Sequence, residues 1–154
     1  MTAYPTKTSH SEPVGRDRRS VSVLLALTLV VVLAGPHLAV ATRAVVNLPV
    51  SAMAVVWARA HGGSCAVHPD LLVTCGSMRG GYSIAGTTVG NVWLYGDRYG
   101  VDRQRHEGRH SDQWAVFGPA FPALYGADWA HAGGDPRHSV FEQWAGLHDG
   151  HYRR

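Results

Sequence analysis

The first long apolar run of this chain, residues 20–42, contains 23 positions without a charged side chain and is mostly Val, Leu and Ala. About 20 apolar residues in a helix span a bilayer, so the run predicts a transmembrane anchor. Residues 43–59 hold a second apolar run, Ala44 to Ala58, which is shorter and contains Pro49. This second run predicts a juxtamembrane helix that packs on the following domain or lies at the membrane surface.

Beyond residue 60 the apolar positions form shorter and more regular groups, which predict one α+β domain over residues 60–154. The segment from Thr87 to Tyr95 is β-branched and aromatic and predicts a strand. A turn at His68-Pro69-Asp70 beside Leu71-Leu72-Val73 predicts a β-hairpin. Helices are expected from about Asp102 to Phe117, from about Phe121 to Ala130 and around Glu142.

The tail before the apolar run, residues 1–19, is rich in Ser, Thr, Pro and charge and is expected to be disordered. Its basic residues favour a cytoplasmic N-terminus and an extracytoplasmic domain, and they are Lys7, Arg16, Arg18 and Arg19. The alternative is a secreted protein, because the small residues Ala39-Val40-Ala41 suit signal cleavage. The apolar run is longer than a typical signal peptide core, which favours an anchor in the cell membrane.

Charge adds little beyond this topology. The formal net charge is +3, and the tail carries +2 of it through four basic and two acidic groups. The domain therefore has no strongly basic face, which argues against a nucleic-acid partner.

Cysteine usage agrees with an exported domain. Cys65 and Cys75 flank the expected hairpin. A disulfide between them would close a loop of about ten residues and add about 2 to 3 kcal/mol to stability. The spacing is unlike that of zinc-binding cysteine pairs, which are two to four residues apart.

The chemically most informative segment is His106-Glu107-Gly108-Arg109-His110, an HExxH motif. On a helix, positions i and i+4 share a face, so both imidazoles can bind one Zn²⁺ while Glu107 lies beside it. Gln113 falls on the same face, where its amide can support a ligand or a substrate. The competing interpretation is a His-rich amphipathic surface helix.

HExxHxxQ on a helix, preceded by a strand and followed by an FExxA segment, resembles the small gluzincin-type zinc metallopeptidases. The matching residues are His106, Glu107, His110, Gln113, Phe141, Glu142 and Ala145. The segments from Gly86 to Tyr95 and around Glu142 also resemble uncharacterised single-span envelope proteins of actinobacteria. The resemblance implies a zincin-like fold, Glu142 as the third zinc ligand and Glu107 as the general base.

Other third ligands remain open from the residues themselves. A metzincin site would need Gly at 113 and His at 116, but the chain has Gln113 and Val116, which excludes that class. Further candidate donors are Asp128, His131, Asp135 and His138. Glu142 is favoured because a carboxylate among Phe141, Trp144 and Leu147 needs a partner, and a metal would supply one.

The motif departs from the family at Gly108 and Arg109, where peptidases of this type usually have uncharged residues. Gly weakens a helix interior by about 0.8 to 1 kcal/mol relative to Ala. We expect Arg109 to pair with Asp112, three residues later, or to lie exposed.

Together these features predict a membrane-anchored, extracytoplasmic zinc metallohydrolase, probable only in its peptidase-like character through the resemblance. Zinc would be held by His106, His110 and Glu142, with water at the fourth position and an extended peptide as substrate beside the strand. Candidates for oxyanion stabilisation are Tyr125, His131 and Tyr152. The alternative is a non-catalytic envelope domain that uses zinc or no metal for structure or protein interaction, with His131 or His138 as a fourth ligand.

Overall fold

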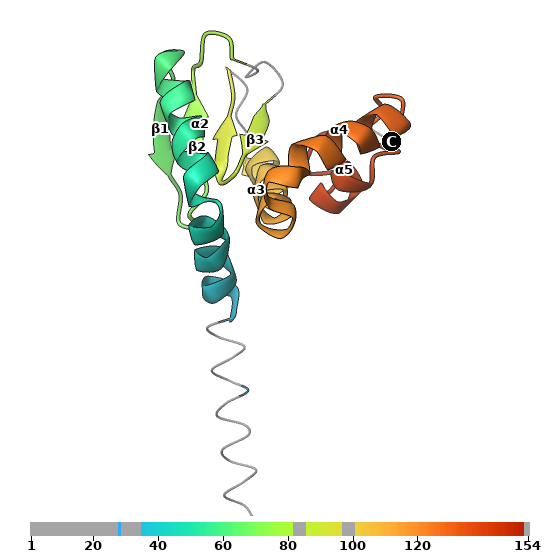
Figure 1. The fold of residues 1–154 in the computed structure, drawn as a ribbon, viewed down its shortest axis with the longest axis horizontal. Coiled ribbons are helices and arrows are strands. Elements are labelled where there is room, and N and C mark those ends of the chain that lie inside the picture. Colours follow the sequence, from blue (N-terminus) through green and yellow to red (C-terminus); the bar gives the residue numbers. More distant parts are fainter. Residues whose placement is uncertain (1–27, 29–34, 82–85, 97–100, 153–154) are drawn as a thin grey trace, which may run out of the picture. The chain divides into compact units, whose positions relative to one another are not determined.

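The computed structural model describes residues 28, 35–81, 86–96 and 101–152 (Figure 1). The chain divides into two units, Met1–Pro36 and His37–Arg154. The elements below belong to the second unit, apart from the start of one helix, Gly35–Val46. The expected tail, residues 1–19, and most of the expected anchor, residues 20–42, lie outside the described residues.

Within the described residues, no single helix has both the length and the apolar character needed to cross a membrane. The helices Gly35–Val46 and α2 (Leu48–Ala60) satisfy those two criteria only when taken as a pair, and they are bent by 67° relative to each other. The bend falls at Asn47, where Pro49 occupies the first turn of α2 and Asn47 Nδ2 donates to the Ser111 carbonyl at 2.9 Å.

Four short strands form one mixed sheet in the order β1-β2-β4-β3. The strands are β1 (Ser64–Val67), β2 (Val73–Gly76), β3 (Thr87–Val89) and β4 (Val92–Leu94). β1 and β2 are antiparallel, as are β3 and β4, whereas β2 and β4 are parallel. This order makes β3 an edge strand and places β4 inside the sheet.

The single strand expected from Thr87 to Tyr95 is in fact a tight hairpin. Gly90 and Asn91 form its two-residue turn, and Gly90 adopts a left-handed φ of +61°. Glycine at the first central position permits this turn, whose twist matches that of the flanking strands. A β-carbon on Gly90 would also clash with Val50 and Ser51 of α2, so the position is restricted by packing as well as by conformation.

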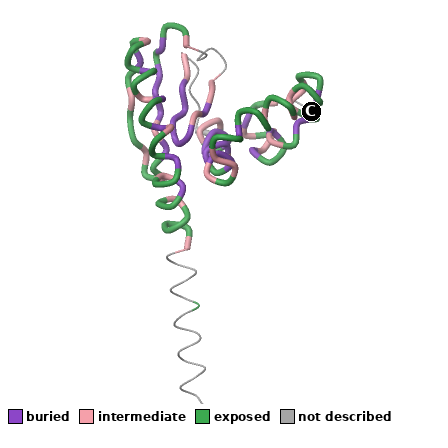
Figure 2. The backbone as a smooth tube through the Cα atoms, viewed as in Figure 1, coloured by how far each residue is buried: buried purple, intermediate pink, exposed green. Residues whose placement is uncertain are grey.

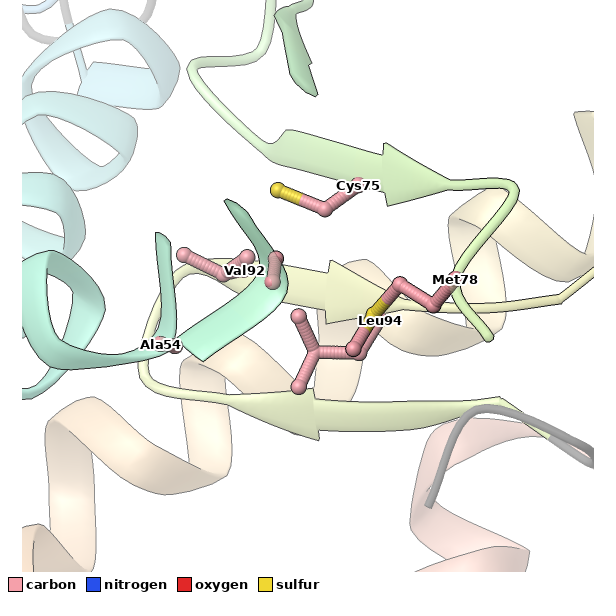
Figure 3. Packing of buried hydrophobic residues seen from close by; sticks show 6 residues of the cluster. Ala54, Cys75, Met78, Val92 and Leu94 are labelled. Carbon is pink, nitrogen blue, oxygen red and sulfur yellow. The ribbon is translucent and has the colours of Figure 1, made fainter. Parts of the chain in front are cut away.

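Helix α2 covers one face of the sheet, and α3 contacts the β3/β4 hairpin. The apolar cluster under α2 comprises Ala54, Ala58, Cys75, Met78, Val92 and Leu94 (Figure 3). Because side chains alternate along a strand, Trp93 of β4 points to the opposite face, where it approaches Gly86 on the Glu107 side. All three residues of β4 are therefore buried (Figure 2).

The remaining elements confirm the expected helices. They are α3 (Val101–Phe117), a 3₁₀ turn (Gly118–Ala120), α4 (Phe121–His131) and α5 (Val140–Ala145). Helix α3 is joined to β3 where Trp114 Nε1 donates to the Thr88 carbonyl at 2.9 Å. The fold class is thus α+β, with a small mixed sheet and several helices, and the HExxH helix contacts the edge strand, α4 and α5.

Candidate metal centre

Three buried side chains from α3 and α5 converge on one point. His106, His110 and Glu142 each offer a ligand atom, and these atoms all lie within 4.8 Å of one another. The two Nε2 atoms are 3.1 Å apart, and Glu142 lies 3.2 Å from His106 Nε2 and 3.5 Å from His110 Nε2. This geometry brings together the three donors that the HExxH motif and the FExxA segment suggested.

The other ring nitrogen of each histidine contacts an oxygen acceptor. His106 Nδ1 lies 3.1 Å from the Gly146 carbonyl, and His110 Nδ1 lies 2.7 Å from Gln113 Oε1. Gln113 Nε2 donates to the Phe141 carbonyl at 2.9 Å, which fixes the orientation of the amide. Each Nδ1 therefore carries hydrogen, and in the neutral rings both Nε2 lone pairs face the shared point.

Two lone pairs at this separation repel unless a cation or a proton lies between them. Burial opposes the charged form of His110, but Glu142 and Glu107 outweigh burial and raise the pKa of His110 above its usual value. Burial likewise opposes ionisation of Glu142, but His106, His110 and Tyr125 hold the pKa of its carboxyl below its usual range. Glu142 Oε2 has no hydrogen bond within the described chain, so the donor set fits a divalent cation.

Glu142 reaches the histidines because α5 is fixed at its start. Ser139 caps the helix and accepts from the Glu142 N–H at 3.2 Å. Asp128, at the far end of α4, accepts from the Ser139 hydroxyl at 2.5 Å and from the N–H groups of Val140 and Phe141 at 3.2 and 3.3 Å. Asp128 is therefore a capping residue rather than a donor of the cluster.

The remaining alternative ligands also lie outside the cluster. Asp135 pairs with Arg137 at 2.5 Å, the side chain of His138 is 73% exposed, and His131 is exposed. Within the described residues the group of donors thus has three members and no fourth His, Cys, Asp or Glu.

Glu107 lies beside the cluster, with its carboxylate almost fully buried. Its Oε2 accepts from the Thr88 hydroxyl of β3 at 2.7 Å, and its Oε1 is 4.0 Å from Arg103 Nε. Glu107, the two histidines and Glu142 all line a cavity of about 650 Å³. Thr88 and Arg103 were not singled out from the sequence, although Arg103 lies one turn before Glu107 on the same helical face.

The two tyrosines proposed for oxyanion stabilisation line the same cavity, whereas His131 is exposed and does not. The Tyr125 hydroxyl donates to Glu142 Oε1. The Tyr152 ring lies 5.8 Å from the His106 ring. Burial, aided by the charge of Glu142, raises the pKa of both phenols, so both remain hydrogen-bond donors at neutral pH.

The expected pairing of Arg109 is wrong. Arg109 donates to the Ala145 carbonyl at 2.7 Å and to Asp149 at 2.9 Å, which ties α3 to the segment after α5. Asp112 instead pairs with Arg43 at 3.2 Å. The charge inside the motif thus fastens the backbone whose Gly146 carbonyl orients His106.

The expected disulfide is present between Cys65 and Cys75, which face each other directly across the β1/β2 hairpin. No protein-family model, curated protein or solved structure matches this chain.

Proposed function

We propose that this chain is a zinc-dependent metallohydrolase, most like a peptidase, with His106, His110 and Glu142 as ligands and Glu107 as general base. The observation that carries the proposal is the convergence of three buried donors beside a buried carboxylate in an accessible cavity. Two imidazoles and a carboxylate suit zinc, and a set of three protein ligands is typical of catalytic rather than structural sites.

Zinc bound by these residues would act as a Lewis acid toward a carbonyl and lower the pKa of a water molecule to about 7. Glu107 is placed to accept the proton of that water and pass it to the departing amine. Thr88 holds one oxygen of Glu107, which leaves the other oxygen toward Arg103 and the cavity. The hydroxyl of Tyr125 or Tyr152 would donate to the negative charge that develops on the carbonyl oxygen.

An extended peptide is the substrate class that the neighbouring strand supports. β3 is an edge of the sheet and lines the cavity, whereas β4 is paired on both sides. A peptide can therefore add beside Thr87–Val89 by strand pairing. Because Trp114 already occupies the Thr88 carbonyl, only a short stretch of this edge is available.

The non-catalytic alternative requires a closed ligand set. His131 or His138 would have to complete it, but both are exposed and neither belongs to the described group of donors. The three-donor set favours hydrolysis for this reason.

Metal content and peptide hydrolysis of purified protein test the proposal together. Glu107→Gln should retain zinc and lose hydrolysis, because it preserves all three donors and removes the base. His106→Ala and His110→Ala should lose zinc, whereas His138→Ala, an exposed control, should keep it. Equal zinc content in the wild type and in a His106→Ala, His110→Ala double variant would reject the site, and zinc without hydrolysis would favour the non-catalytic alternative.

We also propose that the domain is held outside the cytoplasm at a cell membrane. The uncharged residues 20–42 support this, and so does the outer face of α2, where Met53, Val56 and Trp57 are exposed. Protease added to intact cells should digest the domain. Protection of the Tyr152 region in intact but not in opened cells would contradict this topology.

A further inference from the structure

Arg103 is the single Lys or Arg among the described residues that line the cavity, and it lies beside the proposed base. Its side chain is 18% exposed, so the guanidinium is largely removed from water. The other charged groups of the lining are the carboxylates of Glu107 and Glu142. An anion that enters the cavity would therefore be attracted to Arg103 and repelled from both carboxylates.

The hydrogen-bonding capacity of Arg103 is largely unused. A guanidinium has five N–H donors. Arg103 makes one long bond, from Nη2 to the Gly150 carbonyl at 3.4 Å. Its buried Nε has no hydrogen-bond partner among the described residues, and the 4.0 Å to Glu107 Oε1 exceeds hydrogen-bonding distance. A buried cationic donor without a partner is costly, and a bound anion would remove that cost.

The rest of the cavity indicates what accompanies the anion. Its wall from α3 and α4 is aromatic and comprises Trp114, Phe121, Tyr125 and Trp129. The planar fork of a guanidinium matches a carboxylate, which can accept two parallel hydrogen bonds. A peptide joins a carboxylate to a bulky apolar group at its last residue, when that residue has a large side chain.

We propose that Arg103 binds the C-terminal carboxylate of a peptide that ends in an aromatic or large aliphatic residue. The inference rests on the proposed hydrolase function and narrows it to removal of short pieces from the C-terminus. In that reaction one water is consumed, the C–N bond breaks, and a new carboxylate and a free amine are released. Arg103 is then a specificity-determining residue.

Binding of two small probes tests the inference without catalysis. Calorimetry with the full chain would compare N-acetylphenylalanine with its C-terminal amide. The wild type should bind the acid about 10- to 100-fold more tightly, as expected for hydrogen bonds to a charged group. Arg103→Gln should abolish that preference. The control Arg105→Gln, on the same helix with a side chain 58% exposed, should retain it.

Equal binding of acid and amide by the wild type would overturn the inference. So would a preference that persists in Arg103→Gln, because the carboxylate would then bind elsewhere, such as on the metal. If Arg103→Gln fails to fold, Arg103→Lys provides the test, since it keeps the charge but loses the fork and should reduce the preference. Equal loss of acid and amide binding in either variant would assign Arg103 a structural role only.

Hydrolysis separates this inference from the proposed function. Peptides of one sequence would carry a free acid or an amide at the C-terminus, and a third amidated peptide would end in Glu. Faster cleavage of the free acid is expected. Equal cleavage of acid and amide would keep the hydrolase and reject the role of Arg103, as would equally fast cleavage of the Glu peptide. A binding preference without any hydrolysis would keep the Arg103 site and reject the hydrolase.

Discussion

At the scale of single residues, each donor of the metal cluster is oriented by another group. Gln113 holds His110, the Gly146 carbonyl holds His106, and Tyr125 holds Glu142. Such supporting contacts fix the ring tautomer and raise the basicity of the ligand. The site therefore depends on residues that never touch the metal.

Replacing Gln113 tests this dependence. Gln113→Leu removes the acceptor of His110 Nδ1 and should lower metal affinity about 10- to 100-fold. Competition with a chromophoric chelator measures the effect. The exposed Gln143→Leu is the matched control and should keep the affinity of the wild type. Unchanged affinity in Gln113→Leu would show that the amide does not support the ligand.

Arg109 connects the motif to the C-terminal segment, so its removal should affect stability. Arg109→Met loses a charged donor to the Ala145 carbonyl and the pair with Asp149. Because the side chain is 41% exposed, we expect the free energy of unfolding to fall by only about 1 kcal/mol. Denaturant unfolding measures it, and a double-mutant cycle with Asp149→Asn isolates the pair. Arg137→Met, at an exposed pair, should change little, and additive effects in the cycle would exclude coupling.

At the scale of elements, the position of α5 decides whether Glu142 reaches the histidines. The helix has only six residues and cannot be stable alone. Its start is held by Ser139 within the segment and by Asp128 from α4. The cap thus transfers the position of α4 to the third ligand.

Asp128→Ala should lower the free energy of unfolding by about 1 kcal/mol through loss of this cap. Burial acts to raise the pKa of Asp128, but the Ser139 hydroxyl and the N–H groups of Val140 and Phe141 outweigh it and lower the pKa. A carboxyl with a depressed folded-state pKa adds stability above the unfolded-state pKa of about 3.9, and this is lost as the pH falls through the folded-state value.

Unfolding of the wild type and of Asp128→Asn across pH measures this contribution. Their difference in stability should shrink as the pH falls below about 4. A difference that stays constant into that acidic range would show that the charge of Asp128 adds nothing to the cap.

At the scale of the whole molecule, the domain is small and its core is limited. The α2 cluster has six buried residues, four of which are Ala, Cys or Met. A domain of this size gains from a cross-link and from a metal, because each adds to the free energy of folding. The disulfide lies at the β1/β2 end of the sheet, and the metal cluster lies between α3 and α5.

Loss of the disulfide should therefore cost about 2 to 3 kcal/mol, the entropy of closing a loop of about ten residues. Unfolding of oxidised and reduced protein measures the difference. Unreduced, denatured protein should have no thiol reactive at Cys65 or Cys75. Two free thiols per chain in protein taken from an oxidising compartment would contradict the bridge.

Local patterns in the sequence were enough to determine the α+β class, the HExxH helix, the Cys65–Cys75 hairpin and the short helix around Glu142. Each depends on contacts within a few residues, so spacing and residue type specify it directly. The hairpin at Gly90-Asn91 belongs to this group as well. It was missed because the β-branched residues on both sides read as one continuous strand.

Only the tertiary structure decided which distant groups meet. Asp128 and Glu142 were both candidate ligands, and packing of α4 against α5 made one a cap and brought the other to the histidines. Arg109 pairs with a residue 40 positions away, and β3 lies at the edge because β4 inserts beside β2. Such choices depend on how elements pack after chain entropy is lost, and this is not encoded in any local period of apolar residues.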